Sequence, residues 1–138
     1  MENYESFFGE FNLEDPLENA SFHVTRIEDR FNIKLPSDYV EFMEKCNGGE
    51  GFIGENYLIL YPLNEIIEAN EDYEVAKYLP NVLLIGSNGG GEAIAIDFNK
   101  LKKYIIVPFL FEEEAILEQS YSLEGFFLRT LHNEWFDA

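Results

Sequence analysis

The chain has 138 residues, of which 46% are hydrophobic and 16% aromatic, enough for one packed core and too many for a disordered chain. Nine Lys and Arg stand against 27 Asp and Glu, so the formal charge is −18 at pH 7. A field of this sign repels nucleic acid and anionic membranes and speeds encounter with a basic partner, although acidity that serves only solubility remains an alternative.

Targeting and membrane signals are not visible in the sequence. The longest apolar run, residues 104–111, is interrupted by Pro108 and falls short of the roughly 18 residues of a membrane span. The first residues lack the basic region and cleavage site of a signal peptide. The one cysteine, Cys46, cannot form an internal disulfide. We therefore expect a cytoplasmic protein that associates with no membrane.

The N-terminal residues predict a short amphipathic helix docked on the domain within residues 1–18. Four aromatic residues recur there at helical spacing: Tyr4, Phe7, Phe8 and Phe11. Pro16 prevents the helix from continuing.

A second helix is predicted over residues 22–31. Its N-terminal cap is either Ser21 or the capping box that Thr25 forms with Glu28. Asn32 can adopt the left-handed conformation that ends a helix.

A third helix is predicted to start at Pro36, whose fixed φ suits the first helical position, and to end at residues 47–49, Asn-Gly-Gly. Asp38 lies in its first turn, where a negative charge is favourable. Its buried side is predicted to consist of Tyr39, Phe42, Met43 and Cys46.

The rest of the chain predicts strands with helical interruptions. The strands are expected at residues 57–61, 82–85, 93–96 and 104–107, and the apolar run of the first is typical of a strand covered on both faces or central in the sheet. Residues 63–78 and a segment starting near Ser122 are predicted to be helical. We expect one α+β domain over residues 1–138, with a mainly antiparallel sheet, N-terminal helices and a closing C-terminal helix.

The one glycine-rich segment, residues 87–91, predicts a hairpin and not a phosphate site. A phosphate-binding loop requires Gly-x-x-x-x-Gly-Lys-Ser/Thr, and no Lys follows these glycines. A strand follows them, whereas a dinucleotide site needs a helix. Positive-φ glycines in a tight turn explain the pattern.

Catalytic and metal-binding patterns are missing from the sequence. Cys46 is expected in the core, and His23 and His132 are joined to it by no motif. No nucleophile elbow is present, and the Asp97-Phe-Asn99 segment lacks the glycine and distal Glu of a calcium loop. We expect no enzyme, no metal and no cofactor.

Acidic side chains in two stretches without Lys or Arg, residues 46–76 and 104–128, are the candidate partner-binding residues. If the stretches adjoin, they form one negative face that could cover a basic groove. The candidates are Glu65, Glu68, Glu71, Asp72, Glu74, Glu112, Glu113 and Glu114. The alternative is that these acids only keep the protein soluble and that recognition uses exposed aromatics such as Tyr73 or Tyr78.

Three blocks of the sequence resemble the SUKH superfamily. They comprise Val24-x-x-Ile27-Glu28 with Phe31-Asn-Ile-Lys-Leu-Pro36, Asp38-Tyr39-x-x-Phe42-Met43 and Asn47-Gly-Gly49; the segment Leu84-Ile-Gly86-Ser-Asn-Gly-Gly-Gly-Glu92-Ala-x-Ala95-Ile-Asp97; and Ser122-Leu-Glu-Gly-Phe-Phe-Leu128. The resemblance spans about residues 22–131 in the right order. Asn32 and Gly125 depart from the family pattern, and neither change conflicts with the fold.

The resemblance implies an immunity protein that binds and neutralises a cognate bacterial toxin domain, such as a nuclease, without catalysis. Relatives among fungal cell-wall-assembly regulators imply the alternative, a regulatory protein-binding scaffold unrelated to toxins. No catalytic residue is carried over from the family, because its motifs serve folding. We expect a protein partner, and neither nucleic acid nor membrane.

Overall fold

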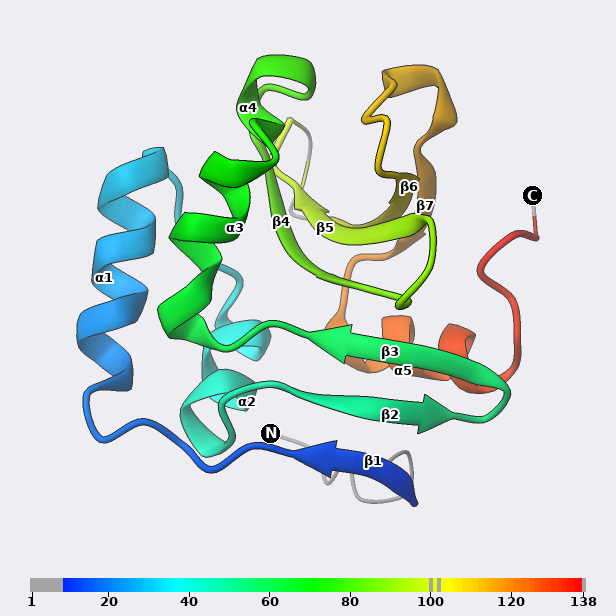
Figure 1. The fold of residues 1–138 in the computed structure, drawn as a ribbon, viewed down its shortest axis with the longest axis horizontal. Helices are drawn as coiled ribbons and strands as arrows, with labels where there is room; N and C mark the ends of the chain where they lie inside the picture. Colours follow the sequence, from blue (N-terminus) through cyan, green and yellow to red (C-terminus); the bar gives the residue numbers. More distant parts are fainter. Residues whose placement is uncertain (1–8, 100, 102, 138) are drawn as a thin grey trace.

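A computed structural model describes residues 9–99, 101 and 103–137, and it contains a seven-stranded antiparallel sheet whose strands lie side by side in chain order (Figure 1). The strands are β1 (Glu10–Leu13), β2 (Gly49–Ile53), β3 (Asn56–Leu60), β4 (Val82–Ser87), β5 (Glu92–Asp97), β6 (Lys103–Pro108) and β7 (Leu117–Ser120). The helices are α1 (Ala20–Phe31), α2 (Ser37–Lys45), α3 (Ile66–Asp72), α4 (Val75–Tyr78) and α5 (Leu123–Leu131), with short 3₁₀ turns η2 (Leu63–Glu65) and η3 (Glu113–Ala115). The predicted α+β class, with its antiparallel sheet and closing helix, is confirmed.

The two faces of the sheet are covered differently. The inner face packs against α1, α2 and α5, and its core includes Ile27, Phe42 and Phe127. The outer face carries a smaller core under α3, α4 and residues 109–116, over strands β4 to β6 only. In the described part of the chain, no helix is long and apolar enough to cross a membrane.

Helices α1 and α2 lie where the sequence predicted helices. The N-terminal cap of α1 is a different residue from the ones predicted. Asn32 ends α1 in the left-handed conformation at φ 55°, as expected. The cap residue is Asn19, so neither Ser21 nor the Thr25–Glu28 box starts the helix. Glu28 instead accepts a hydrogen bond from the Leu35 N–H at 2.8 Å, which ties α1 to the connection that follows it.

All four residues predicted for the buried side of α2 are buried: Tyr39, Phe42, Met43 and Cys46. Pro36 is the N-cap of α2 and not its first helical residue as predicted, and the helix ends at Lys45 with Cys46 as its C-cap. Burial is also the main reason that the pKa of the Cys46 thiol rises to about 11.

The N-terminal helix prediction is wrong for residues 10–13, which form the edge strand β1. Tyr4, Phe7 and Phe8 lie outside the described residues. Phe11 pairs with Gly51, and a Cβ added at Gly49 would lie 2.8 Å from the Phe11 ring. The glycines of β2 therefore leave room for Phe11, a contact 40 residues away that local spacing does not reveal.

The sequence interpretation also missed β2 and β7 and misjudged β3. Two of the five residues of β2 are glycine, a residue that is disfavoured within strands, so the sequence pattern does not reveal this strand. It pairs with β1 and β3. Strand β3 is not covered on both faces: Leu58 and Leu60 are buried, whereas Tyr57 and Ile59 are only partly buried. The outer face of β2 and β3 thus lacks the helical cover that β4 to β6 have.

The predicted hairpin between β4 and β5 is confirmed. Its glycines do not all have the positive φ that the prediction assumed. Of Gly89, Gly90 and Gly91, only Gly89 has a positive φ, at 79°. Gly86 serves close packing, because a Cβ there would lie 2.1 Å from the Ile59 carbonyl oxygen.

Replacing Gly89 with Val should therefore lower the free energy of unfolding by about 1–3 kcal/mol, because the left-handed conformation strains a β-branched residue. Gly91→Val is the matched control, since its φ is not positive and a Cβ would meet open space. Its effect should stay within about 0.5 kcal/mol. Urea unfolding of both variants tests this, and equal losses would contradict it.

Cys46 should react slowly with a thiol reagent in the native protein. With a pKa of about 11, its thiolate fraction at pH 8 is roughly 100-fold lower than at the ordinary value of 9.0, and the side chain is buried. The labelling rate should rise about tenfold per pH unit below pH 11. Cys46→Ala should cost about 1 kcal/mol. Native labelling as fast as that of the urea-unfolded chain would overturn this assignment.

Candidate protein-binding face

The predicted acidic residues are all exposed, and they come from two parts of the fold. The first group lies on η2, α3 and the turn after α3, and the second lies on and before η3. Glu71 differs from the others because it pairs with Arg30 of α1, with 2.8 Å between Arg30 Nη2 and Glu71 Oε2. Both side chains are about half exposed, so the pair contributes little to stability, but it neutralises one of the candidate charges.

Three aromatic rings bring the two base-free stretches into contact. The ring of Tyr73, just after α3, lies 4.9 Å from that of Phe109 and 6.2 Å from that of Phe111. Phe111 adopts a positive φ of 54°, and its N–H bonds to the Pro108 carbonyl at 2.9 Å. Asp72 and Glu74 flank Tyr73 in the chain, and Glu112 follows Phe111. The stretches therefore adjoin, as the hypothesis of a single acidic face requires.

The uncovered side of β2 and β3 contributes apolar residues that sequence reasoning missed. Phe52 is 46% exposed, and its ring lies 5.0 Å from that of Tyr57, edge to face. The Tyr57 hydroxyl donates to a Glu50 carboxylate oxygen at 2.6 Å, and this bond raises the pKa of the phenol. The alternation of Glu50 and Phe52 with buried residues was the available signal, and Gly49 and Gly51 at the buried positions obscured it.

Tyr61 connects this side of the sheet to the aromatic rings above it. Its side chain is partly buried and packs against both cores. Burial raises the pKa of its phenol, and Ser87 and Tyr73 lie near enough to affect that pKa as well. We use the name apolar strip for Phe52, Tyr57, Ile59, Tyr61, Tyr73 and Phe109.

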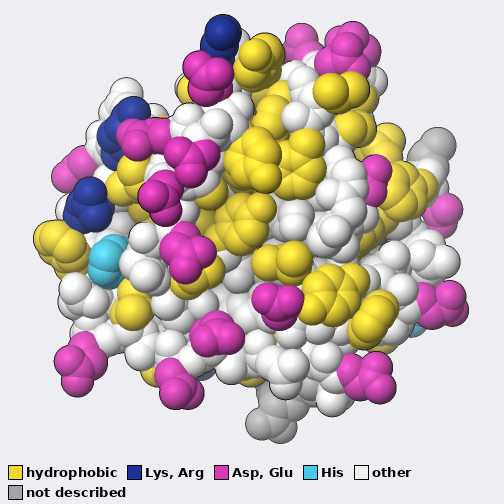
Figure 2. Space-filling model, in the orientation of Figure 1, with side chains coloured by type: hydrophobic (Ala, Val, Ile, Leu, Met, Phe, Trp, Pro, Cys, Tyr) yellow, Lys and Arg dark blue, Asp and Glu magenta, His cyan; other side chains and the backbone are white. Residues whose placement is uncertain are grey.

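Figure 2 shows hydrophobic side chains across the middle of this face and acidic side chains around them, with Lys and Arg only towards the edges. A shallow depression of about 440 Å³ lies beside the strip. Its walls include four carboxylates, from Glu14, Asp15, Glu50 and Glu65. Glu50 of its wall accepts the hydrogen bond from Tyr57 of the strip, so the depression borders the strip. We name the strip and the surrounding acids the acidic–aromatic face.

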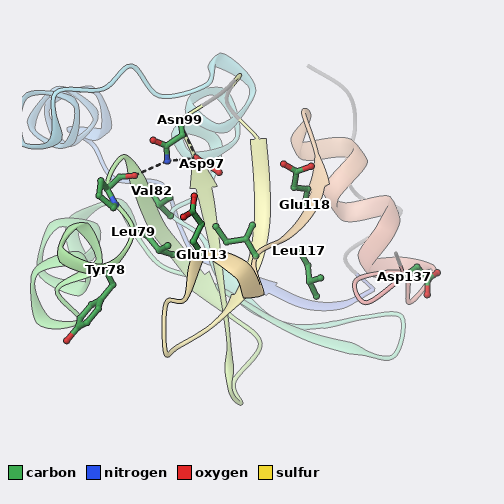
Figure 3. A pocket seen from close by; sticks show the side chains of 11 residues that line it. Tyr78, Leu79, Val82, Asp97, Asn99, Glu113, Leu117, Glu118 and Asp137 are labelled. Carbon is green, nitrogen blue, oxygen red and sulfur yellow. Dashed lines mark hydrogen bonds between the residues drawn. The ribbon is translucent and has the colours of Figure 1, made fainter.

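Another groove lies between the ends of β4 and β5 and the segment leading into β7, and the candidate residue Glu113 is part of its lining. It measures about 710 Å³, and Tyr78 and Asp137 lie at its opposite ends (Figure 3). Asp97 accepts two hydrogen bonds from Asn99 at 2.9 Å, and Glu118 pairs with Lys103 at 3.0 Å. Its described lining contains no Ser, Thr, Cys, His or Lys, and its ionisable side chains are one phenol and four carboxylates.

The other candidates for chemistry are distributed over separate elements. Cys46 lies in the core at the end of α2, His23 lies on α1, and His132 follows α5. Among the described residues, no group of three or more His, Cys, Asp or Glu side chains is placed to hold a metal ion. The arrangement that stands out chemically is the acidic–aromatic face, which suits contact with a protein surface of opposite charge.

Comparison with known proteins supports the resemblance seen in the sequence. The chain is 30% identical to a Bacillus subtilis (strain 168) protein described as uncharacterized protein YnaB, over 130 aligned residues that cover 88% of this chain and 82% of that protein. The model of the SMI1 / KNR4 family (SUKH-1) matches residues 23–129, from α1 to the last turns of α5. The chain therefore belongs to the SMI1/KNR4 (SUKH-1) family.

Proposed function

We propose that this protein is an immunity protein, which binds a cognate bacterial toxin domain and neutralises it by covering a basic surface, without catalysis of its own. The observation that carries the proposal is the contact of Tyr73 with Phe109, which joins two stretches lacking any Lys or Arg into one face. The SUKH family membership supports a protein partner.

The charge of the chain favours a toxin that acts on nucleic acid. A nuclease needs Lys and Arg to contact phosphates, so its substrate groove is basic. A chain with 27 acidic and nine basic residues is attracted to such a groove and is itself repelled by nucleic acid. Binding there would block access of the substrate, which requires no chemistry from the immunity protein.

Co-expression tests this function directly. We expect the chain to restore growth of cells that produce the toxin domain encoded beside its gene, and the two proteins to elute together in gel filtration. An unrelated toxin domain serves as the control. Absence of both rescue and complex would reject the proposal for that pair. Capture of a partner unrelated to toxins from a locus without a toxin gene would favour a regulatory scaffold.

Reversal of exposed acids should slow association with the toxin domain. Glu65→Lys, Glu68→Lys and Asp72→Lys together are expected to reduce the association rate about 10-fold or more at low salt, because the field that steers encounter is weakened. Glu71 is left unchanged because its reversal would also break the pair with Arg30. The difference should shrink as salt rises, since exposed charges are screened over about 8–10 Å at physiological ionic strength.

Asp29→Lys, Glu44→Lys and Glu124→Lys make a matched control, because they change the net charge equally but lie on α1, α2 and α5. The midpoint of thermal unfolding should change little in either variant. Stopped-flow rates across a salt series measure the effect. If both triple variants slow association equally, net charge alone is responsible and the face is not.

A further inference from the structure

The outer face of the sheet is covered over one half and open over the other. Above β4 to β6, Leu84, Ala95 and Val107 are fully buried under α3, α4 and residues 109–116. On β2 and β3, the apolar residues of the same face are Phe52, Tyr57 and Ile59, and all three remain at least partly exposed. Figure 1 shows β2 and β3 crossing the view below α3, with α5 behind them and no helix in front of them. A continuous apolar patch of this kind marks a site of interaction on many proteins.

The charges around the open half determine what can cover it. Residues 46–76 and 78–99 supply β2, β3, α3 and the 87–91 hairpin, and they contain no Lys or Arg. The nearby acids include Glu50, which the Tyr57 hydroxyl holds at 2.6 Å, and Glu65 across the depression. An apolar centre with a rim of one charge fits a partner with an apolar centre and a rim of the opposite charge.

We propose that the apolar strip is the anchor of the interface, and that it receives an apolar or aromatic side chain of the partner protein flanked by Lys or Arg. This inference rests on one part of the proposed function, namely that the chain acts by binding another protein. The flanking cations contact Glu50 and Glu65, and the apolar side chain packs against Phe52, Tyr57 and Ile59.

The strip and the acids have different roles in binding. Exposed acids act over several ångströms and mainly raise the association rate. Buried aromatic contacts at the centre of an interface form only on docking and mainly slow dissociation. The rings at the centre of the strip pack against each other, with 5.0 Å between the ring centres of Phe52 and Tyr57. A Cβ added at Gly89 would lie 3.3 Å from the Tyr57 ring. The glycine therefore leaves the edge of that ring uncovered at the tip of the hairpin.

A peptide probe tests the strip without any toxin. The probe is acetyl-Lys-Phe-Lys-Trp-Lys-Lys-amide, and the same peptide with Glu in place of every Lys is its control. Titrated into the ¹⁵N-labelled protein, the basic peptide should give saturable amide shifts confined to β2, β3, residues 87–91 and the neighbourhood of Tyr73. The acidic peptide should give none. Shifts centred on α1 or α5, or no saturable binding of the basic peptide, would overturn the inference.

Phe52→Ser should weaken peptide binding about 10-fold or more, because it removes the most exposed ring of the open half. Phe22→Ser is the matched control: Phe22 is 55% exposed, compared with 46% for Phe52, but it lies on α1 beside Arg26. The midpoint of thermal unfolding should show that both variants are folded. Ile59→Ser provides a second variant on the neighbouring position of β3. Equal weakening by Phe22→Ser would overturn the inference.

The complex with the toxin domain separates this inference from the proposed function. There, Phe52→Ser should raise the dissociation rate about 10-fold or more and leave the association rate nearly unchanged. If the complex forms and Phe52→Ser has no effect, the strip is not the anchor, although the immunity function stands. If no complex forms, the immunity function fails, and the peptide titration still decides about the strip. A concentration-dependent dimer abolished by Phe52→Ser would identify a second copy as the occupant and overturn the proposal.

Discussion

The carboxylate of Asp38 is the constraint on which the arrangement of layers depends. One oxygen accepts the Tyr104 hydroxyl of β6 at 2.9 Å and the Tyr39 N–H at 2.8 Å, and the other accepts the Leu123 N–H at 2.7 Å. Leu123 is the first residue of α5, where N–H groups lack helical partners. One side chain therefore joins α2, the sheet and the start of α5 through charge-assisted bonds. These bonds fix the helical layer on the inner face.

The outer face has a counterpart in Asn70, which is 4% exposed. Strands β3 and β4 pair only at their ends, so the Leu84 backbone has no strand partner on that side. The Asn70 amide takes the partner's place: it donates to the Leu84 carbonyl at 2.9 Å and accepts the Leu84 N–H at 2.8 Å. A buried amide with these bonds holds α3 against the sheet. Tyr73, one residue beyond α3, thereby comes to lie against Phe109.

Together these two anchors produce an asymmetric molecule. The inner face is closed by three helices, and its polar groups and its one thiol serve packing, as the raised pKa of Cys46 illustrates. On the outer face, α3, α4 and residues 109–116 cover only β4 to β6. The aromatic residues of β2 and β3 therefore remain at the surface beside the acids of α3. This division lets the inner layer maintain the fold and leaves the residues of the outer face at the surface.

The sequence by itself determined the elements whose signals are local: the buried side of α2, the end of α1 at Asn32, the strands β4 to β6 and the start of α5 near Ser122. Periodicity, capping and turn chemistry act over a few residues, so they can be read along the chain. The tertiary structure alone decided that Phe11 belongs to a strand, since its room comes from Gly49 and Gly51. It also decided that Phe52 and Tyr57 stay exposed, that Glu71 is paired with Arg30, and that Tyr73 meets Phe109. Each of these depends on which distant segment covers a residue, and composition and spacing carry no information about that.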